Sequence, residues 1–255
     1  MKFSKWSGLG NDFILVAAEP DVAGIDAVKW CDRRRGIGAD GVVIVTPLGG
    51  HDFRMRIINS DGSEAAMCGN ASRCVAKFIA GHGLGVGGRF DLHTLSGIVR
   101  TGINPDGTVT VDMGAPRPFL GEITLSAAGR NFTAETVSMG NPHAVIFVKD
   151  IAAVELEHWG PTLEHDPQFP DRCNIEFAQV LAPGRIRMRV WERGCGVTAA
   201  CGTGSCATLA AAQRRGLVDT EAEIVLDGGS LFIRREEGGH LLMTGPAEEI
   251  FHGEI

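Results

Sequence analysis

FRMRIINSDGSEAAMCGN, from Phe53 to Asn70, aligns without a gap with IRMRVWERGCGVTAACGT, from Ile186 to Thr203. Both stretches carry Arg-Met-Arg at the same distance before a Cys-Gly pair, and both have an alanine two residues before the cysteine, which is Cys68 or Cys201. A repeat of this kind indicates two halves of common design. Because each half presents one thiol, we expect a site built between the halves.

A helix is predicted directly after each thiol. The segments Ala71–Ala80 and Gly204–Ala212 are runs of small and apolar residues, and Leu209–Arg215 extends the second. Cys68 and Cys201 are therefore expected at helix N-termini, where N–H groups and the helix dipole bind an anion and lower the pKa of a thiol. The alternative is that both are small buried residues packing a helix start.

Length and charge favour an enzyme of two modest domains. The chain has 255 residues, of which 44% are hydrophobic, and a net charge of −7; this composition supplies two cores but no basic surface for nucleic acid or an anionic bilayer. The N-terminus MKFSKWSGLGND lacks the apolar region of a signal peptide, and no run approaches the ~18 apolar residues of a membrane span. We expect a cytoplasmic protein that binds neither nucleic acid nor membrane.

The seven cysteines are predicted to be free thiols, because an odd number in a chain of this length does not suit a disulfide framework. A zinc site made by Cys68, Cys74, Cys201 and Cys206 is the alternative. Each pair lies on one predicted helical run with no turn between its members, unlike structural zinc ligands. We therefore expect no metal site, and expect Cys74 and Cys206 to face the core.

Many short strands separated by Gly and Pro predict an α+β fold and not the βαβ alternation of a parallel sheet. Besides the helices after the thiols, one is expected around Ile25–Arg34. The domain boundary is expected at Met113–Pro118, where two prolines interrupt a strand pattern. The predicted strands are Phe13–Ala17, Gly41–Thr46, Phe53–Ile58, Val99–Ile103, Val109–Met113, Ala144–Val148, Ile175–Val180, Ile186–Val190, Ile224–Leu226, Ser230–Arg234 and Leu241–Thr244.

A Gly-Asn pair precedes a predicted strand in each half. Gly10-Asn11 stands before Phe13–Ala17, and Gly140-Asn141 stands before Ala144–Val148. Gly-Asn is also an ordinary turn dipeptide. The matched placement favours a functional role, because an Asn side chain both donates and accepts hydrogen bonds and so suits an ammonium or carboxylate group.

Gly36-Ile-Gly-Ala-Asp-Gly41 matches the dinucleotide fingerprint G-x-G-x-x-G only as a string. The mechanism of that motif needs a strand before it and a helix after it, so that the pyrophosphate meets a helix N-terminus. Here Cys31–Arg35 precedes the glycines and the strand-like Val42–Thr46 follows them. The segment is predicted to be a turn into a strand, and a nicotinamide cofactor is not expected.

Six short blocks, in order along nearly the whole chain, resemble the signature sequences of the diaminopimelate epimerase family. Cys-Gly-Asn or Cys-Gly-Thr alone would also fit the wider group of cofactor-independent amino-acid racemases, whereas the six blocks together are specific. They are Ser7–Asp12, Asn59–Glu64, Cys68–Cys74, Gly140–His143, Glu192–Gly194 and Ala200–Gly204.

The resemblance implies two pseudo-symmetric α+β domains, each a β-barrel-like sheet around a central helix, with the active site in the cleft between them. The N-terminal half would contain residues 1–114 and be joined by a C-terminal strand at about 242–255. The other half would contain residues 115–241. The implied activity is epimerisation of LL-diaminopimelate to meso-diaminopimelate, in the biosynthesis of lysine and peptidoglycan precursors.

The residues themselves indicate the same chemistry. Inverting an α-carbon needs one group to remove a proton from one face and another to deliver a proton to the opposite face, and Cys68 and Cys201 supply such a pair. The sequence has neither a recognisable pyridoxal lysine motif nor another cofactor signature, so no cofactor is expected. Carbanion charge must then be stabilised electrostatically, by two helix N-termini aimed at the α-carboxylate.

The resemblance also implies individual roles. Cys68 and Cys201 would be the acid/base pair, and His143 and Glu192 would set their protonation. The alternatives are that His143 is a structural histidine after Pro142 and that Glu192 and Arg193 form a surface pair at a strand end. The expected partner is a small amino-acid substrate, with a homodimer left open. The implied substrate-binding residues are Asn11, Asn59, Asn141, Asn174 and Arg193, together with the backbone of Gly69, Asn70, Gly202 and Thr203.

Three positions depart from the family pattern. Val197 stands where many members carry Glu, Gly41 where some carry Gln, and Ser7 where His is common. None of them removes a proposed acid, base or carboxylate ligand. The loss of the Glu removes a hydrogen-bond partner expected near the second thiol, which affects the tuning of Cys201.

Two other functions remain open at this stage. A related racemase acting on proline, hydroxyproline or histidine would use the same two thiols without a clamp for a second carboxylate. A non-enzymatic binding protein would use the same cleft without exchanging the substrate α-hydrogen with solvent.

Overall fold

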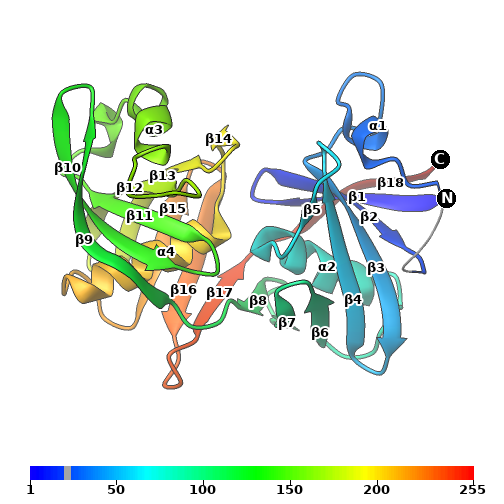
Figure 1. The fold of residues 1–255 in the computed structure, drawn as a ribbon. Coiled ribbons are helices and arrows are strands. Elements are labelled where there is room, and N and C mark those ends of the chain that lie inside the picture. Colours follow the sequence, from blue (N-terminus) through cyan, green and yellow to red (C-terminus); the bar gives the residue numbers. More distant parts are fainter. Residues whose placement is uncertain (20–23) are drawn as a thin grey trace. The chain divides into compact units, whose positions relative to one another are not determined.

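The computed structural model describes residues 1–19 and 24–255, and this part of the chain divides into two compact units (Figure 1). Unit 1 contains Met1–Asp112 and Thr244–Ile255, and unit 2 contains Met113–Met243. The chain thus enters unit 2 at the start of the Met113–Pro118 segment and returns to unit 1 near its C-terminus. Each unit is described on its own below.

Unit 1 is formed mainly by strands, with one short and one long helix. Its elements are β1 (Lys2–Gly8), β2 (Asn11–Ala17), α1 (Ala27–Cys31), β3 (Gly41–Gly49), β4 (Asp52–Asn59), β5 (Glu64–Ala65), α2 (Gly69–Gly81), β6 (Arg89–Thr94), β7 (Gly97–Ile103), β8 (Val109–Asp112) and β18 (Glu248–Glu254).

Unit 2 has the same kinds of element in a similar order. They are β9 (Arg117–Ala127), β10 (Arg130–Ser138), β11 (Pro142–Phe147), the short 3-10 helix η1 (Ile151–Ala153), α3 (Leu156–Glu164), β12 (Asn174–Ala182), β13 (Arg185–Glu192), β14 (Gly196–Val197), α4 (Gly202–Arg214), β15 (Glu221–Leu226), β16 (Gly229–Arg235) and β17 (Leu241–Gly245), whose last residues belong to unit 1.

Strand pairing repeats between the units. The parallel pair β2–β3 corresponds to β11–β12, and the parallel pair β4–β6 corresponds to β13–β15. Antiparallel pairing of β3 with β4 likewise corresponds to that of β12 with β13. In the repeated Arg-Met-Arg segments, Met55 and Met188 are buried while the flanking arginines are not. The alternation of a half-buried strand therefore explains why this tripeptide occurs in both halves.

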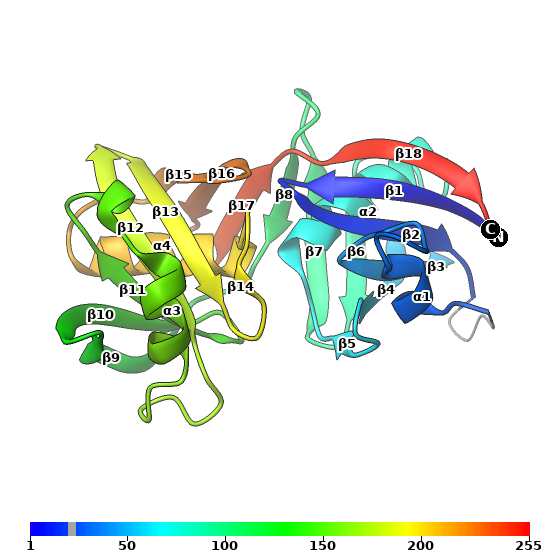
Figure 2. The same ribbon diagram turned by 90° about the horizontal axis from the view of Figure 1, so that it is seen from above.

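One helix in each unit is enclosed by strands. Helix α2 contacts β1, β2, β6, β7, β8 and β18, and helix α4 contacts β10, β11, β12, β13, β15 and β16. Figure 2 shows each of these helices running alongside the strands of its own unit. Cys74 and Cys206 are fully buried on them, as predicted. A helix covered on several sides needs mainly small or apolar residues around its circumference, as α4 has. Helix α2 has them too but also buries Arg73 and Asn70.

The prediction of a helix around Ile25–Arg34 is wrong in extent, because helical structure is confined to Ala27–Cys31. Asp32 ends it: its side chain accepts hydrogen bonds from the backbone N–H groups of Arg34 and Arg35 at 2.7 and 2.9 Å. Local bonds of this kind compete with helix continuation. The following glycine-rich segment leads into β3 without forming a helix, as predicted for a turn into a strand.

No helix among the described residues has the length and apolar character needed to cross a membrane.

Candidate active site

The two thiols occupy the same position on two equivalent helices. Cys68 is the N-cap of α2 and Cys201 is the N-cap of α4, both with extended backbone conformations. The carbonyl of each cysteine accepts hydrogen bonds from the backbone N–H and the hydroxyl of the serine four residues later, Ser72 or Ser205, at 2.9 to 3.0 Å. The amides of a first helical turn have no intrahelical acceptor. Each thiol therefore lies beside a site that favours an anion.

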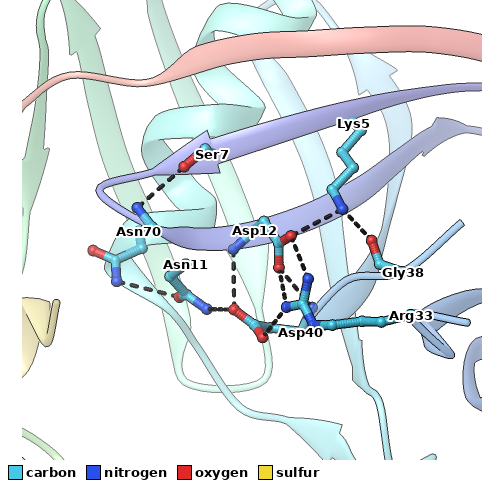
Figure 3. Close-up of polar contacts among 9 residues, drawn as sticks. Lys5, Ser7, Asn11, Asp12, Arg33, Gly38, Asp40 and Asn70 are labelled. Atoms are coloured by element: carbon cyan, nitrogen blue, oxygen red, sulfur yellow. Dashed lines mark hydrogen bonds and ion pairs between the residues drawn. The ribbon is translucent and has the colours of Figure 1, made fainter. Parts of the chain in front are cut away.

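In unit 1, two predicted site residues, Asn11 and Asn70, lie together beside Cys68 (Figure 3 shows Asn11 and Asn70). The side-chain oxygen of Asn11 lies 3.8 Å from Cys68 Sγ and accepts a hydrogen bond from Asn70 Nδ2 at 3.2 Å. Asn11 Nδ2 donates to Asp40 Oδ2 at 2.6 Å. Because the carboxylate of Asp40 accepts only, it fixes the Asn11 amide with its oxygen toward the thiol.

Asp40 is itself held by a charged network (Figure 3). Arg33 donates to both oxygens of Asp12, at 2.9 and 2.7 Å, and to Asp40 Oδ1 at 2.8 Å. Lys5 forms an ion pair with Asp12 at 2.9 Å. Burial opposes ionisation of Asp12, but hydrogen bonds from Arg33 and Lys5 outweigh it and hold the Asp12 pKa below its ordinary value of 3.8. The Asp12 carboxylate is therefore ionised at neutral pH.

Asn59 and Gly69 occupy different positions relative to this group. Gly69 begins α2 next to Cys68 and is buried. Asn59 is the last residue of β4, and its side chain donates to Ser63 Oγ at 3.0 Å within the turn that follows. Its observed hydrogen bonds are therefore to that turn and not to Cys68 or Asn11.

In unit 2, four predicted residues form a chain of polar contacts. Thr203 Oγ1 lies 3.6 Å from Cys201 Sγ and accepts from Asn141 Nδ2 at 3.4 Å. The other amide atom of Asn141, Oδ1, lies 3.1 Å from His143 Nε2. His143 Nδ1 in turn lies 2.6 Å from an oxygen of Glu176. Histidine and glutamate are both fully buried. The chain thus runs from the thiol to a carboxylate that the sequence did not single out.

Glu192 faces Cys201 from the end of β13, and Thr198 donates its hydroxyl to this carboxylate. Burial raises the pKa of Glu192, and the charge of Glu176 adds to that rise; hydrogen bonds from Thr198 and Cys201 and the nearby His143 oppose it. Burial also raises the pKa of Cys201 well above its ordinary value of 9.0, and the charges of Glu192 and Glu176 raise it further. The expectation that the helix N-terminus would lower this pKa is therefore wrong for Cys201, because burial and two carboxylates outweigh the helix dipole.

The turn after β13 carries Arg193 and is tied to the rest of the unit. Asn174 accepts from the backbone N–H of Arg193 at 3.0 Å and donates to the carbonyl of Pro142 at 2.8 Å. The buried Glu164 accepts from the backbone N–H of Gly194 at 2.9 Å. Arg193 and Asn141 both line a hollow of about 530 Å³, a size that suits a small ligand.

The sequence matches the family model of diaminopimelate epimerase over residues 3–118 and 135–250. A diaminopimelate epimerase of Cyanothece sp. is 47% identical over 278 residues, which cover 100% of this chain and 99% of the relative. One of Rhodospirillum centenum is 49% identical over 270 residues, covering 100% of this chain and 92% of the relative. The chain belongs to the diaminopimelate epimerase family.

Several solved structures have the same fold at much lower sequence identity. A probable proline racemase of Agrobacterium radiobacter K84 has a TM-score of 0.74 at 16% identity, covering 100% of this chain and 92% of that chain. A hydroxyproline epimerase of Agrobacterium vitis has a TM-score of 0.74 at 17% identity, covering 100% and 90%. A Bacillus anthracis protein of the PhzF family has a TM-score of 0.73 at 16% identity, covering 100% and 98%. The pseudo-symmetric α+β architecture predicted from the sequence is thus confirmed.

The three departures from the diaminopimelate epimerase pattern lie on β14, at the start of β3 and on β1. Val197 is exposed on β14, and the neighbouring Thr198 supplies a hydrogen bond to Glu192. Gly41 starts β3, where a Cβ would lie 3.0 Å from the carbonyl oxygen of Ile58. Ser7 accepts from the backbone N–H of Gly10, closing the turn that precedes Asn11.

Sequence reasoning missed three carboxylates of the two half-sites. Asp40 stands inside the glycine-rich string that resembles a dinucleotide motif, and Glu164 stands on a helix that was not predicted. Glu176 belongs to the strand Asn174–Ala182, whose first five residues are all buried. A charged residue inside such an apolar strand was the available signal, because a buried carboxylate requires a partner.

Proposed function

We propose that this protein converts LL-diaminopimelate to meso-diaminopimelate by a two-base mechanism in which Cys68 and Cys201 are the acid and the base. The observation that carries the proposal is the presence of one thiol at the N-cap of an enclosed helix in each unit, in a chain of the diaminopimelate epimerase family. In this proposal each unit supplies one of the two catalytic thiols.

The reaction starts with proton abstraction from the α-carbon by one thiolate. Negative charge then develops on the α-carbon and its carboxylate, and the other thiol delivers a proton to the opposite face. Backbone N–H groups of Gly69 and Asn70 on α2, and of Gly202 and Thr203 on α4, bind that carboxylate. Fixed donors at two helix N-termini stabilise the developing charge without reorganisation during the step.

The environment of Cys201 supports its role as the first proton donor. Burial and the charges of Glu192 and Glu176 hold it as a thiol. A two-base inversion needs one thiol and one thiolate at the start of each turnover. Cys68 would then take the first proton in that direction, and the roles exchange in the reverse reaction. His143 and Glu192 set the protonation of Cys201 in this scheme.

Recognition of the far end of diaminopimelate is assigned to Arg193 with the side chains of Asn141 and Asn174, and Asn59 would also hold the substrate. A guanidinium binds a carboxylate with two parallel hydrogen bonds, and the Asn amides form hydrogen bonds with the remaining polar atoms of the substrate. Arg193 is exposed and lines the same hollow as Asn141, which suits a group that meets a ligand. Asn11, bonded to Asn70 next to Cys68, would contribute from unit 1.

The place of reaction is proposed to be the cytoplasm. All seven cysteines are free thiols, which suits a reducing compartment.

The decisive experiment is incubation with LL-diaminopimelate in deuterated water, followed by stereochemical and mass analysis. We expect meso product that carries solvent deuterium at the inverted carbon. Replacing Cys68 or Cys201 by Ala should lower the epimerisation rate by at least ~10²–10⁴-fold, because one-sided proton transfer cannot invert a centre. Near-normal turnover in either variant would rule out the two-base mechanism. Absence of any exchange in the wild type would favour a binding protein.

A substrate panel distinguishes this function from a proline, hydroxyproline or histidine racemase. Lysine lacks the distal carboxylate, so it should react poorly if Arg193 binds that group. Arg193→Lys should raise KM for diaminopimelate, because the ammonium group of lysine cannot form the two parallel hydrogen bonds that a planar guanidinium makes to a carboxylate. The measurement is kcat/KM for LL-diaminopimelate, lysine and proline with both proteins. Comparable wild-type activity on lysine or proline would reassign the enzyme to the broader racemase group.

A further inference from the structure

Glu176 is a fully buried carboxylate beside the candidate active site, and its hydrogen bond to His143 has no part in the mechanism above. Its side chain has 0% exposure, and only one of its oxygens has a partner, His143 Nδ1 at 2.6 Å. No donor among residues 1–19 and 24–255 lies within hydrogen-bonding distance of Oε2. A buried carboxylate with one unpaired oxygen costs folding free energy. If Glu176 had only a structural role, an apolar residue of the same size would stabilise the fold more.

The carboxylate reaches the first turn of α4 because residue 204 is glycine. A Cβ at Gly204 would lie 2.7 Å from Glu176 Oε1 and 3.2 Å from Cys201 Sγ. The carboxylate and the thiol therefore flank the same backbone position. Glu176 comes from β12, so the approach of carboxylate and thiol depends on the packing of α4 against that strand.

We propose that Glu176 is a positioning residue of the unit 2 half-site: it keeps a proton on His143 Nδ1, and through His143 it fixes the amide of Asn141 beside Thr203 and Cys201. The proposal rests on the proposed function, since Asn141 and Cys201 are assigned there to substrate binding and proton transfer.

The hydrogen bonds define how this positioning works. An ionised carboxylate only accepts, so Nδ1 of His143 donates to Glu176. Asn141 has its oxygen 3.1 Å from His143 Nε2 and its NH₂ group 3.4 Å from Thr203 Oγ1. Because an amide oxygen only accepts, Nε2 must also carry a proton, so both ring nitrogens of His143 donate in this arrangement. With its NH₂ group on that side, Asn141 presents donors where a substrate carboxylate is expected.

The charge of Glu176 also acts directly on the thiol. Burial is the main cause that raises the pKa of Cys201, followed by the charges of Glu192 and Glu176. Two carboxylates therefore act on this thiol, Glu176 from β12 and Glu192 from β13. His143 from β11 contacts Glu176 and acts on Glu192. Loss of the Glu176 charge should make Cys201 ionise at lower pH.

Two substitutions separate the charge from the hydrogen bond. Glu176→Gln keeps the shape and an acceptor for His143 Nδ1 but removes the charge. Glu176→Asp keeps the charge but draws the carboxylate away from His143 by one methylene. The matched control is Glu135→Gln, which neutralises another buried carboxylate of unit 2 that pairs with Arg215.

The first readout is the pH dependence of Cys201 alkylation by iodoacetamide, followed by peptide mapping, in proteins whose folding is checked by circular dichroism. We expect the alkylation midpoint to move to lower pH in Glu176→Gln and to stay near the wild-type value in Glu176→Asp and Glu135→Gln. An unchanged profile in folded Glu176→Gln would overturn the electrostatic part. This readout needs no substrate, so it holds even where the wild type fails to epimerise diaminopimelate.

The second readout is kcat/KM for LL-diaminopimelate. Glu176→Gln and Glu176→Asp should each lower it by roughly 10–100-fold, as loss of a supporting hydrogen-bond partner does elsewhere, whereas Glu135→Gln should not. In a His143→Asn background the further loss from Glu176→Gln should be clearly smaller than in the wild type, because the part of the effect that passes through the histidine is already lost and only the direct effect of the charge on Cys201 is left. Multiplicative losses in the double variant would refute positioning through His143. Inactivity of the wild type would instead refute the proposed function.

Discussion

The absence of a side chain at Gly204 allows the Glu176 carboxylate to lie beside the Cys201 thiol. An added Cβ would meet Glu176 Oε1 at 2.7 Å and Cys201 Sγ at 3.2 Å. In an exposed helix, Gly→Ala stabilises by up to ~1 kcal/mol. At Gly204 the added Cβ would overpack the site, which costs about 1–3 kcal/mol of folding free energy. This cost should exceed the gain in helix stability, because both neighbouring atoms belong to a tightly packed site.

Gly204→Ala should therefore lower both kcat/KM and the free energy of unfolding. The matched control is Gly81→Ala in α2, where a Cβ would meet nothing within 4 Å. That variant should keep full activity and be as stable as the wild type or more so. Urea unfolding and steady-state kinetics of the two variants provide the comparison. Equal behaviour of the two variants would mean that the close approach at Gly204 has no consequence.

Site residues differ in how far the sequence could reveal them. Cys68 and Cys201 stand out because the repeat retains them, and Asn11, Asn141 and His143 lie in blocks that resemble a family. Glu176 has no repeated counterpart and looks like any polar residue in a strand. Its importance depends on which face of β12 it occupies and on the lack of a side chain at position 204, and both depend on tertiary packing.

At the scale of single elements, the turn between β1 and β2 carries Asn11 toward Cys68 and is anchored by Asp40. The Asp40 carboxylate accepts from Asn11 Nδ2 at 2.6 Å and from the backbone N–H of Asp12 at 3.0 Å. Arg33 donates to its other oxygen. The start of β2 is thus fixed by a residue that directly precedes β3, its parallel neighbour.

Asp40→Asn should lower kcat/KM by about tenfold, because the amide can turn an NH₂ group toward Asn11 and reverse its orientation. The free energy of unfolding should change by no more than ~1 kcal/mol, since the Asp40 side chain is 42% exposed. Asp106→Asn is the control, because Asp106 likewise accepts hydrogen bonds in a turn, from Thr108. If both variants have wild-type kinetics, the orientation of Asn11 is not set by Asp40.

Helices and strands were predictable where neighbouring residues in the sequence form a clear pattern of apolar and polar positions. The helices after both thiols start within two residues of the predicted positions, because their small and apolar runs are unambiguous. Helix α3 was missed because Gly160 and Pro161 lie within it. Gly160 is required there by packing, since a Cβ would lie 2.5 Å from the Trp191 ring. A sequence pattern does not show that contact.

At the scale of the whole molecule, the sequence repeat of Phe53–Asn70 in Ile186–Thr203 predicted the division into two similar units. The pattern of no single helix or strand predicted it as well. The strands β9 and β10 were not predicted, because Gly121 and the exposed alternate residues of β9 obscure the strand pattern. Their counterparts in unit 1, β18 and β1, lie at opposite ends of the chain and pair with each other. Matching the two halves therefore requires the C-terminal strand, which only the family resemblance supplied.

Two buried thiols of unit 1, Cys31 and Cys74, make the stability of the fold sensitive to alkaline pH. Burial is the main cause that raises the pKa of Cys31 from its ordinary value of 9.0 to about 11, and that of Cys74 to about 12. A thiol whose pKa is higher in the folded state stabilises the fold fully below pH ~9. As the pH rises from about 9 toward these values, the unfolded chain loses its proton first, so the stabilisation is lost.

The free energy of unfolding should therefore fall between about pH 9 and about pH 11, by up to ~1.4 kcal/mol per pH unit for each such thiol. Urea unfolding at several pH values measures this slope, with Cys74→Ala as the comparison protein. That variant removes one titrating group, so its stability should decline less steeply although its value at pH ~8 is lower. The chain has no tyrosine, so thiolate formation can be followed independently by ultraviolet absorbance. An identical slope in Cys74→Ala would show that the folded state gives up the Cys74 proton as readily as the unfolded chain.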